Sequence, residues 1–295
     1  MAIISSLGIL TDDTAGTFSI GGDLAVRRLG FGAMRISGAR NGEEVRDRDE
    51  ARRLIRRVVD RGVNFVDTAN IYGYGESEEI IAEAIHPYAE NLLIATKAGF
   101  FPAKVLPGHV TLPPKGDPKH IKEACEGSLR RLRVDVIDLY QIHVPDPSIP
   151  FADTIGAFVE LQNEGKIRHI GISNVTASQL SFAQQLCTVV SVQNRYNAGD
   201  RVSDDVLDAC EAQGIAFLPY SPLLVQNQKA VAEIAAIAQA HGVLAQNVSL
   251  QWLMHRSPVM LPIPGTSQMK HLNENLQALS FQLSSEELAR LDALL

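Results

Sequence analysis

The chain of 295 residues has little of several things, and each shortage excludes a class of protein. It has three cysteines and no CxxC pair, so neither a disulfide framework nor a zinc finger is predicted. Unpaired cysteines favour a reducing compartment, and we expect a cytoplasmic protein. The 27 basic residues are outnumbered by 34 acidic ones, and the net charge of -7 argues against nucleic-acid binding through a basic surface. No apolar run reaches the ~20 residues that cross a bilayer, so no membrane partner is expected.

The N-terminal residues carry no targeting signal that we can identify. The start, MAIISSLGILTDD, is mildly apolar, lacks a basic region and then turns acidic, which is not typical of a signal peptide. We predict one domain over residues 1–295, with residues 1–16 as a flexible N-terminal segment.

What the sequence does have is a regular alternation of short apolar runs with amphipathic helical segments. This alternation predicts a parallel sheet with crossover helices. We predict strands at 29–34, 63–67, 92–97, 136–143, 167–173, 189–193, 215–220 and 259–263. We predict helices at 48–61, 76–86, 118–132, 151–164, 176–186, 203–213, 228–241 and 268–279.

Eight strands favour a closed (β/α)8 TIM barrel over an open sheet. An open dinucleotide-binding sheet needs G-x-G-x-x-G after an early strand, and here Arg35 stands at the third glycine position after Gly30-Phe31-Gly32. No GKS or GKT occurs, so a Walker loop is also excluded.

Three further elements decorate the predicted barrel. Residues 17–20 and 24–27 flank Gly21-Gly22-Asp23 and predict an N-terminal β-hairpin. Two extra helices are predicted at 245–256 and 284–294, and Ser284 with Glu287 fits a capping box at the start of the second.

The longest segment without a predicted element runs from residue 98 to 118. It contains two phenylalanines and five prolines, and it follows the strand that ends at Lys97. Long loops in compact domains are usually lids or binding loops, so we expect it to overhang the barrel mouth and contact an organic substrate. The alternative is a loop that packs on the barrel wall.

The predicted strands end in polar side chains that can do acid–base chemistry, and a barrel brings these strand ends to one mouth. A tyrosine hydroxyl is a weak acid, but a nearby ammonium group stabilises its phenolate, and a carboxylate keeps that ammonium charged. An imidazole can orient a carbonyl group by donating a hydrogen bond. The set is Asp67, Tyr72, Lys97 and His143, which can protonate a carbonyl oxygen as hydride reaches the carbon.

Each of these residues alone also has a structural interpretation. Asp67 can cap the next turn, and Lys97 can be a surface lysine or a structural partner of Asp67. His143 can order the turn Val-Pro-Asp-Pro, and Tyr72 can be a packing residue. Their occurrence together at successive strand ends favours the catalytic interpretation.

Seven segments in order carry a family resemblance: FVDTANIYGYGESEEIIAEAI, IATKAGF, DLYQIHVPDP, EGKIRHIGISN, VQNRYN, PYSPL and LPIPGTSQMKHLNENLQAL. Together they resemble the aldo-keto reductases, from about Leu24 to the end of the chain. The resemblance implies a (β/α)8 barrel with the hairpin closing its bottom and a nicotinamide cofactor extended over its mouth.

The resemblance assigns a role to each residue of the acid–base set. By motif, Asp67, Tyr72, Lys97 and His143 correspond to that family's catalytic tetrad. Tyr72 would donate the proton in reduction, and Lys97 with Asp67 would make it a better acid. His143 would orient the carbonyl group.

The resemblance also implies contacts to the nicotinamide. Ser173, Asn174 and Gln193 match positions that hydrogen-bond the carboxamide. Tyr220 matches the aromatic side chain that stacks on the ring. Taken alone, Asn174 or Gln193 can simply satisfy backbone groups at a strand end.

The rest of the cofactor would follow the C-terminal third of the chain. Ser221 and Leu223 would lie near the pyrophosphate. An anion can bind the N-terminus of the last barrel helix, which we expect to begin at Gly265, Thr266 and Ser267. Glu274 and Asn275 match adenine contacts, although both can also be exposed helix residues.

The sequence departs from the family pattern where the 2′-phosphate of NADP would lie. Many members have a lysine after the IP of the last strand and an arginine six residues later, and here these positions are Gly265 and His271. A neutral imidazole does not replace a bidentate guanidinium, so we expect weaker binding of the 2′-phosphate. Lys270 can compensate only if it is not solvated. We expect NADPH as cofactor, with NAD as the alternative.

Three classes of function stay open. The first is reversible, NADPH-dependent reduction of an aldehyde or ketone, or NAD-dependent sugar or alcohol dehydrogenation at the same site. The pattern is similar to pyridoxal reductases, which makes pyridoxal a candidate substrate. The second is a Schiff-base aldolase that uses Lys97, which leaves the cofactor positions without a purpose. The third is a nicotinamide-sensing subunit like the potassium-channel β subunits that resemble this family, although the intact tetrad counts against pure sensing.

The expected partner is a small carbonyl or alcohol compound. We expect no metal site, and we expect a monomer or a small homo-oligomer.

Overall fold

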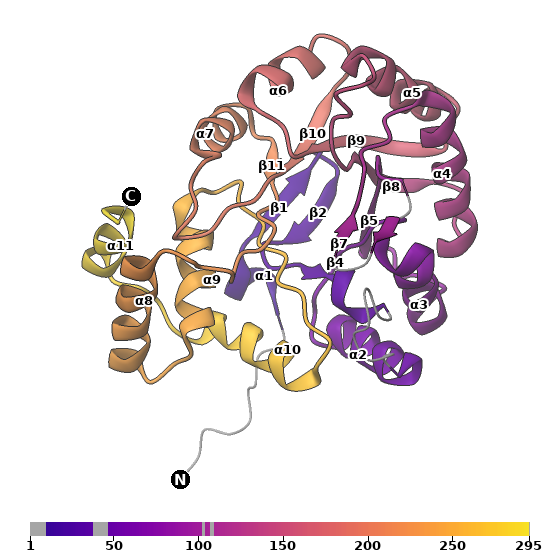
Figure 1. The fold of residues 1–295 in the computed structure, drawn as a ribbon. Coiled ribbons are helices and arrows are strands. Elements are labelled where there is room, and N and C mark those ends of the chain that lie inside the picture. Colours follow the sequence, from indigo (N-terminus) through magenta and orange to yellow (C-terminus); the bar gives the residue numbers. More distant parts are fainter. Residues whose placement is uncertain (1–9, 38–46, 102–103, 107–108, 295) are drawn as a thin grey trace.

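The computed structural model describes residues 10–37, 47–101, 104–106 and 109–294, which form an α/β fold. Seven parallel strands form one sheet in the order β11-β10-β9-β8-β5-β4-β3, and helices surround them (Figure 1). The predicted α/β class with a parallel sheet is therefore confirmed. The strands are β3 (Phe31–Gly32), β4 (Phe65–Asp67), β5 (Leu93–Ala98), β8 (Ile137–Ile142), β9 (Ile167–Ser173), β10 (Val189–Gln193) and β11 (Ala216–Phe217).

Helix α2 (Arg48–Asp60) buries one apolar face and leaves its charged face outside, whereas α9 (Ala245–Arg256) is buried on all sides from Asn247 to Met254. In α2 the buried residues are Ala51, Leu54, Ile55 and Val58, as the helical spacing predicts. The others are α1 (Asp12–Ala15), α3 (Glu76–Ile85), α4 (Pro118–Leu132), α5 (Phe151–Asn163), α6 (Ala177–Ala183), α7 (Asp204–Gln213), α8 (Gln228–His241), α10 (Met269–Leu276) and α11 (Ser285–Asp292). Short 3-10 turns are η1 (Ala33–Ile36), η2 (Tyr72–Gly75) and η3 (Gln277–Ser280).

The segment predicted as an eighth strand, 259–263, is not a regular strand. It is hydrogen-bonded to β11 at Phe217. The Phe217 N–H donates to the Val259 carbonyl oxygen at 2.9 Å, and the Leu261 N–H donates to the Phe217 carbonyl oxygen at 2.8 Å. On its other side, Gly30 and Gly32 donate to the carbonyl oxygens of Pro262 and Pro264 at 2.9 and 3.3 Å. The two prolines have no N–H to donate, so no continuous ladder forms. We call residues 259–264 the seam, because they link the two edge strands of the sheet.

Arg28 fastens the start of the sheet to the region before the seam. Its Nη2 donates to the carbonyl oxygens of Met254 and Ser257, both at 2.7 Å. These bonds join residues 226 and 229 positions apart in the chain.

A hairpin precedes the sheet: β1 (Thr17–Ile20) pairs antiparallel with β2 (Leu24–Arg27). It lies in the middle of the ring of helices in Figure 1. Ile20 and Val26 are buried in one apolar cluster with Phe65, Leu139 and Leu261, which come from three different parts of the ring. The hairpin therefore packs into the interior that the strands enclose.

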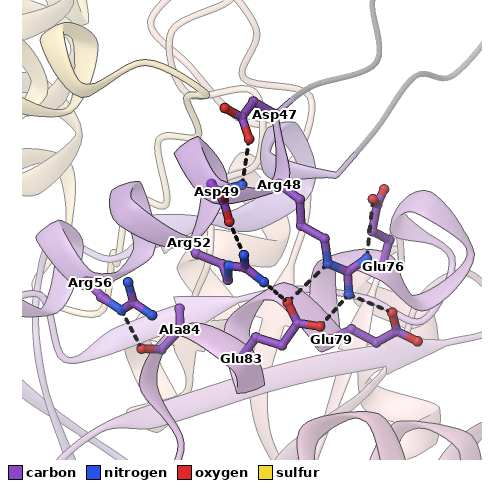
Figure 2. Close-up of polar contacts among 9 residues, drawn as sticks. All are labelled: Asp47, Arg48, Asp49, Arg52, Arg56, Glu76, Glu79, Glu83 and Ala84. Carbon is purple, nitrogen blue, oxygen red and sulfur yellow. Dashed lines mark hydrogen bonds and ion pairs between the residues drawn. The ribbon is translucent and has the colours of Figure 1, made fainter.

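An ion-pair network joins the outer faces of α2 and α3 (Figure 2). The guanidinium of Arg48 lies 2.7 Å from Glu83, 2.9 Å from Glu79 and 3.7 Å from Glu76. Arg52 also donates to Glu83, at 2.8 Å. The hydrogen bonds from Arg48 have the largest effect on the Glu83 carboxyl, and together with Arg52 they lower its pKa to about 2, although burial opposes the shift.

Some predicted elements differ in the structure. Residues 1–9 of the predicted flexible segment lie outside the described residues, whereas Leu10 is buried and α1 follows it. The segment 98–118 is not wholly irregular, because β6 (Lys104–Leu106) pairs with β7 (His109–Thr111). The helix predicted at 268–279 is divided into α10 and η3. Helices α9 and α11 occupy the ranges expected for extra helices, and Ser284 and Glu287 form the expected capping box.

Within the described ranges, no helix combines the length and the apolar character needed to cross a membrane.

Candidate active site

The centre of the site is an ion pair between Asp67, at the end of β4, and Lys97, on β5. Lys97 Nζ lies 2.7 Å from Asp67 Oδ2 and donates to the Thr68 carbonyl oxygen at the same distance. The Lys97 side chain has no exposed surface. Burial by itself lowers the pKa of Lys97, but the charges and hydrogen bonds of Asp67 and Tyr72 outweigh it and raise that pKa above its usual value. The ammonium form is therefore the stable one.

Tyr72 lies above this pair on η2, the turn that follows β4. Lys97 Nζ is 5.2 Å from the centre of the Tyr72 ring. The turn is tight because Gly73, Tyr74 and Gly75 all have left-handed φ angles, of 60°, 58° and 98°. This conformation is uncommon for a residue with a Cβ, and the Tyr74 backbone N–H donates to the Ile71 carbonyl oxygen at 3.3 Å.

The start of α3 holds this turn in place. Ser77 donates to the Ala33 carbonyl oxygen at 3.0 Å and shares a 2.8 Å hydrogen bond with Thr68. Glu78 is fully buried and accepts from Thr96 at 2.6 Å and from Arg131 at 2.7 Å. Both anchors join the turn that carries Tyr72 to the strands that carry Asp67 and Lys97.

His143 follows β8 and faces Tyr72 edge-on, with 5.9 Å between ring centroids. The Phe100 ring also packs against the imidazole, with 4.6 Å between ring centroids. The backbone N–H of His143 donates to the Ala98 carbonyl oxygen at 2.7 Å. The imidazole is therefore held between two strand ends, at the same end of the sheet as Tyr72.

Asn174 connects His143 to Tyr220. Its Nδ2 donates to the His143 carbonyl oxygen at 2.8 Å and to Ser173 Oγ at 3.0 Å. Its Oδ1 accepts from the Tyr220 hydroxyl at 2.8 Å. Burial raises the pKa of Tyr220, which keeps this hydroxyl a donor.

Gln193 and Gln141 both donate to the second oxygen of Asp67. Gln193 Nε2 lies 2.9 Å and Gln141 Nε2 lies 3.1 Å from Asp67 Oδ1. Asp67 therefore has a cation on one oxygen and two amide donors on the other. Gln141 was not predicted as a site residue. A glutamine inside an otherwise apolar strand could have indicated a buried polar contact.

One cavity of about 870 Å³ joins almost all of the predicted residues. Lys97 lies below its floor, and Glu274 is not on its wall. The predicted residues that line it are Asp67, Tyr72, His143, Ser173, Asn174, Gln193, Tyr220, Ser221, Leu223, Gly265, Thr266, Ser267, His271 and Asn275. Residues that line it but were not predicted as site residues include Met34, Arg35, Phe100, Leu112, Val144 and Gln246.

The end of the cavity beside α10 has neither a lysine nor an arginine at positions 265 and 271, which are Gly265 and His271. Gly265, Thr266 and Ser267 do not begin a helix, because α10 starts at Met269. Lys270 has a side chain that is 79% exposed and lies 3.7 Å from Glu274. Lys270 is therefore solvated and paired rather than directed into the cavity.

The groups that line the cavity suit the parts of a dinucleotide. At one end it has amide and hydroxyl donors beside an aromatic ring, the chemistry that holds a carboxamide-bearing ring. At the other end it has the loop before α10 and the amide of Gln246, which donates to Glu274 at 3.3 Å. A flat polar ring can bind between such groups. No cluster of three or more metal-ligating side chains occurs among the residues that the model places.

Comparisons with known proteins show the family to which the chain belongs. Residues 28–295 match the aldo/keto reductase family. An uncharacterized oxidoreductase of Schizosaccharomyces pombe is 41% identical over 94% of this chain and 89% of its own length. Pyridoxine 4-dehydrogenase of Escherichia coli is 36% identical over 95% of this chain and 99% of its own. A solved aldo-keto reductase of Klebsiella pneumoniae, in complex with NADP and acetate, has a TM-score of 0.76 at 28% identity and covers 94% of each chain.

The chain belongs to the aldo/keto reductase family and is an NAD(P)-dependent oxidoreductase.

Proposed function

We propose that this protein reduces an aldehyde or ketone to the alcohol with NADPH, reversibly, on a (β/α)8 barrel whose eighth strand is the seam. The observation that carries the proposal is the buried Asp67–Lys97 pair below Tyr72, with His143 in the same cavity. Reduced nicotinamide, when bound, supplies the hydride to the carbonyl carbon. The chain's own residues supply the proton and the orientation.

Tyr72 is the proton donor in this proposal. The ammonium of Lys97 beside it stabilises the phenolate that remains after the proton leaves. Asp67 balances that ammonium in the buried environment, and without Asp67 the lysine would lose its charge more easily. His143 orients the carbonyl oxygen towards the Tyr72 hydroxyl. In the reverse direction Tyr72 takes the proton from the alcohol.

The other polar residues of the cavity hold the cofactor in this proposal. Ser173, Asn174 and Gln193 bind the carboxamide, and Tyr220 stacks on the ring. Ser221 and Leu223 lie along the pyrophosphate. The remaining contacts come from Gly265, Thr266, Ser267, His271, Glu274 and Asn275.

The cavity favours an organic carbonyl compound of moderate size. Phe100, Leu112 and Val144 supply apolar wall, and Phe100 contacts the catalytic His143. The 36% identity to pyridoxine 4-dehydrogenase makes pyridoxal the first substrate to test. We also propose a cytoplasmic location, since all three cysteines are free thiols.

A Schiff-base mechanism is disfavoured by the position of Lys97. A nucleophilic lysine needs an uncharged amine that can reach the substrate carbonyl. Lys97 is fully buried, is not on the cavity wall and is held in its charged form. Its geometry suits a lysine that acts on Tyr72.

The test is oxidation of NADPH and of NADH, followed at the nicotinamide absorbance, with pyridoxal, 4-nitrobenzaldehyde and small sugars. Wild type and Tyr72→Phe are compared at equal concentration. We expect faster turnover with NADPH and a loss of at least about 100-fold in kcat for Tyr72→Phe, with cofactor binding retained. Faster turnover with NADH would instead favour the NAD alternative, which is supported by the absence of a lysine at position 265 and of an arginine at position 271.

Two results contradict the proposal. One is turnover by Tyr72→Phe equal to wild type. The other is failure of the wild-type protein to bind either cofactor in a fluorescence titration. Binding of cofactor without Tyr72-dependent turnover of any carbonyl in the panel would favour the sensing subunit.

A further inference from the structure

Below the cavity floor, one level of the sheet carries a row of polar side chains. In the strand register Lys97 is opposite Gln141, Gln141 is opposite Gly171, and Gly171 is opposite Ser191. Lys97, Gln141 and Ser191 are all fully buried. Three buried polar residues on neighbouring strands need a common set of hydrogen bonds, since unsatisfied polar groups are costly in such a place.

Gln141 is the centre of that set. Its Nε2 donates to Asp67 Oδ1 at 3.1 Å, and its Oε1 accepts from Ser191 Oγ at 3.4 Å. Gly171 leaves the space in which these side chains meet. A Cβ on Gly171 would lie 2.2 Å from Ser191 Oγ and 2.8 Å from Gln141 Cγ. The glycine is therefore required for the side chains of β8 and β10 to approach each other.

The two amides on Asp67 Oδ1 differ in one respect. Gln193 lines the cavity, whereas Gln141 does not. In the proposed function Gln193 also serves the cofactor, so its bond to Asp67 is open to competition. The bond from Gln141 to Asp67 is not open to such competition, because Gln141 does not line the cavity and cannot contact a bound molecule there.

We propose that Gln141 is a positioning residue that holds Asp67 on Lys97 from below, independently of the cofactor, through the Gly171 gap and Ser191. The inference rests on the proposed function, because it acts on the proton transfer at Tyr72. Gln141 touches neither substrate nor cofactor. It neutralises part of the Asp67 charge and fixes the carboxylate orientation, and Lys97 carries the effect to Tyr72.

The direction of the effect follows from the groups around Tyr72. They include Lys97 and Asp67 from below, His143 at 5.9 Å and Tyr220 through its charge interaction. Removal of the Gln141 donor leaves more uncompensated negative charge on Asp67. That charge opposes formation of the Tyr72 phenolate, so Tyr72 ionises at higher pH.

The experiment replaces Gln141 by methionine, which has similar volume but no amide. We expect kcat for 4-nitrobenzaldehyde with NADPH to fall about tenfold, with the NADPH dissociation constant unchanged. The alkaline limb of the pH–rate profile should move upward by roughly half a unit. Ser191→Ala removes only the hydrogen bond that Ser191 donates to Gln141, so it should give smaller changes in the same direction. It replaces Gln141→Met in the experiment if Gln141→Met does not fold.

A second readout uses the protein without cofactor. The tyrosinate absorbance of wild type minus that of Tyr72→Phe isolates the ionisation of Tyr72. Burial raises the pKa of Tyr88, Tyr140, Tyr196 and Tyr220, so these phenols titrate at higher pH. In the Gln141→Met background the isolated transition should also move upward, measured against the Gln141→Met/Tyr72→Phe double variant.

The matched control is Gln251→Met. Gln251 is also buried and its amide donates to the Ala278 carbonyl oxygen, on α9 and away from Asp67. This change should lower thermal stability without moving either pH transition. If Gln141→Met behaves like Gln251→Met while wild type shows Tyr72-dependent turnover, the positioning role is overturned and the proposed function stands. If wild type shows no Tyr72-dependent turnover, both are overturned.

Discussion

Two ion-pair systems in this protein use the same chemistry in opposite surroundings. Lys97 and Asp67 form one pair with side chains that are 0% and 3% exposed. Arg48 and Glu83 belong to a network on the outer face of α2 and α3, where their side chains are 36% and 26% exposed. The surface network contains more ion pairs than the buried site, yet it is the buried pair that lies next to the cavity.

The comparison teaches that the number of contacts does not measure the energetic weight of an ion pair. Exposed pairs contribute about 0.2–1 kcal/mol each because water already solvates the charges. A buried pair is a poor source of net stability, but removing one partner costs about 3–5 kcal/mol, since the other charge stays buried. The surface network is thus a fastening between helices, whereas Lys97 and Asp67 depend on each other.

The largest effect that tests this comparison is expected from Lys97→Met. The change leaves the Asp67 carboxylate buried without its cation and leaves the Tyr72 phenolate without a stabilising charge. We expect a loss of about 3 kcal/mol in urea unfolding and a loss of at least about 100-fold in kcat. The double variant Lys97→Met/Asp67→Asn should regain most of the stability and none of the activity. Recovery of activity in the double variant would contradict the role of Lys97.

A much smaller effect is expected from Arg48→Met on the surface. It removes a guanidinium from three carboxylates, but all of them can be solvated by water. We expect a loss of about 1 kcal/mol or less in urea unfolding, decreasing as salt is added, with kcat unchanged. A loss as large as that of Lys97→Met would show that the network is not a simple surface fastening.

The smallest effect is a pH dependence of the same network. The pKa of Glu83 is about 2 in the folded protein, below the ordinary 4.5. A lowered pKa means that Glu83 contributes stability above about pH 4.5 and loses it as the pH falls towards about 2. The difference in unfolding free energy between wild type and Glu83→Gln should therefore shrink over that window. A difference that stays constant would contradict the ion-pair role of Glu83.

Much of the site could be predicted from the sequence because parallel strands end at one mouth. That rule placed Asp67, Tyr72 and His143 together, and the structure shows them on one cavity. The rule does not predict contacts among strand residues that lie deeper in the sheet than the strand ends. Gln141 was therefore missed, since its function depends on the register of three strands and on the space left by Gly171.

The differences in the fold also have physical causes. The seam does not form a ladder because its prolines cannot donate, although apolar content alone favours a strand there. The pairing of β6 with β7 was not predicted, because both strands are only three residues long and lie in a segment rich in proline. The buried carboxylate of Glu78 could not be predicted, because its partners Thr96 and Arg131 come from other elements.

The seam has a consequence for how the protein is made. The strand it pairs with on one side is near the start of the chain, and Gly32 lines the same cavity as Gly265 and Asn275. During synthesis from the N-terminus, the wall beside Gly32 is incomplete until the ribosome has passed residue 275. A nascent chain that already contains the acid–base residues therefore still lacks a closed cofactor cavity. The cavity can therefore be completed only after residue 275 has been made, even if the earlier strands have already paired.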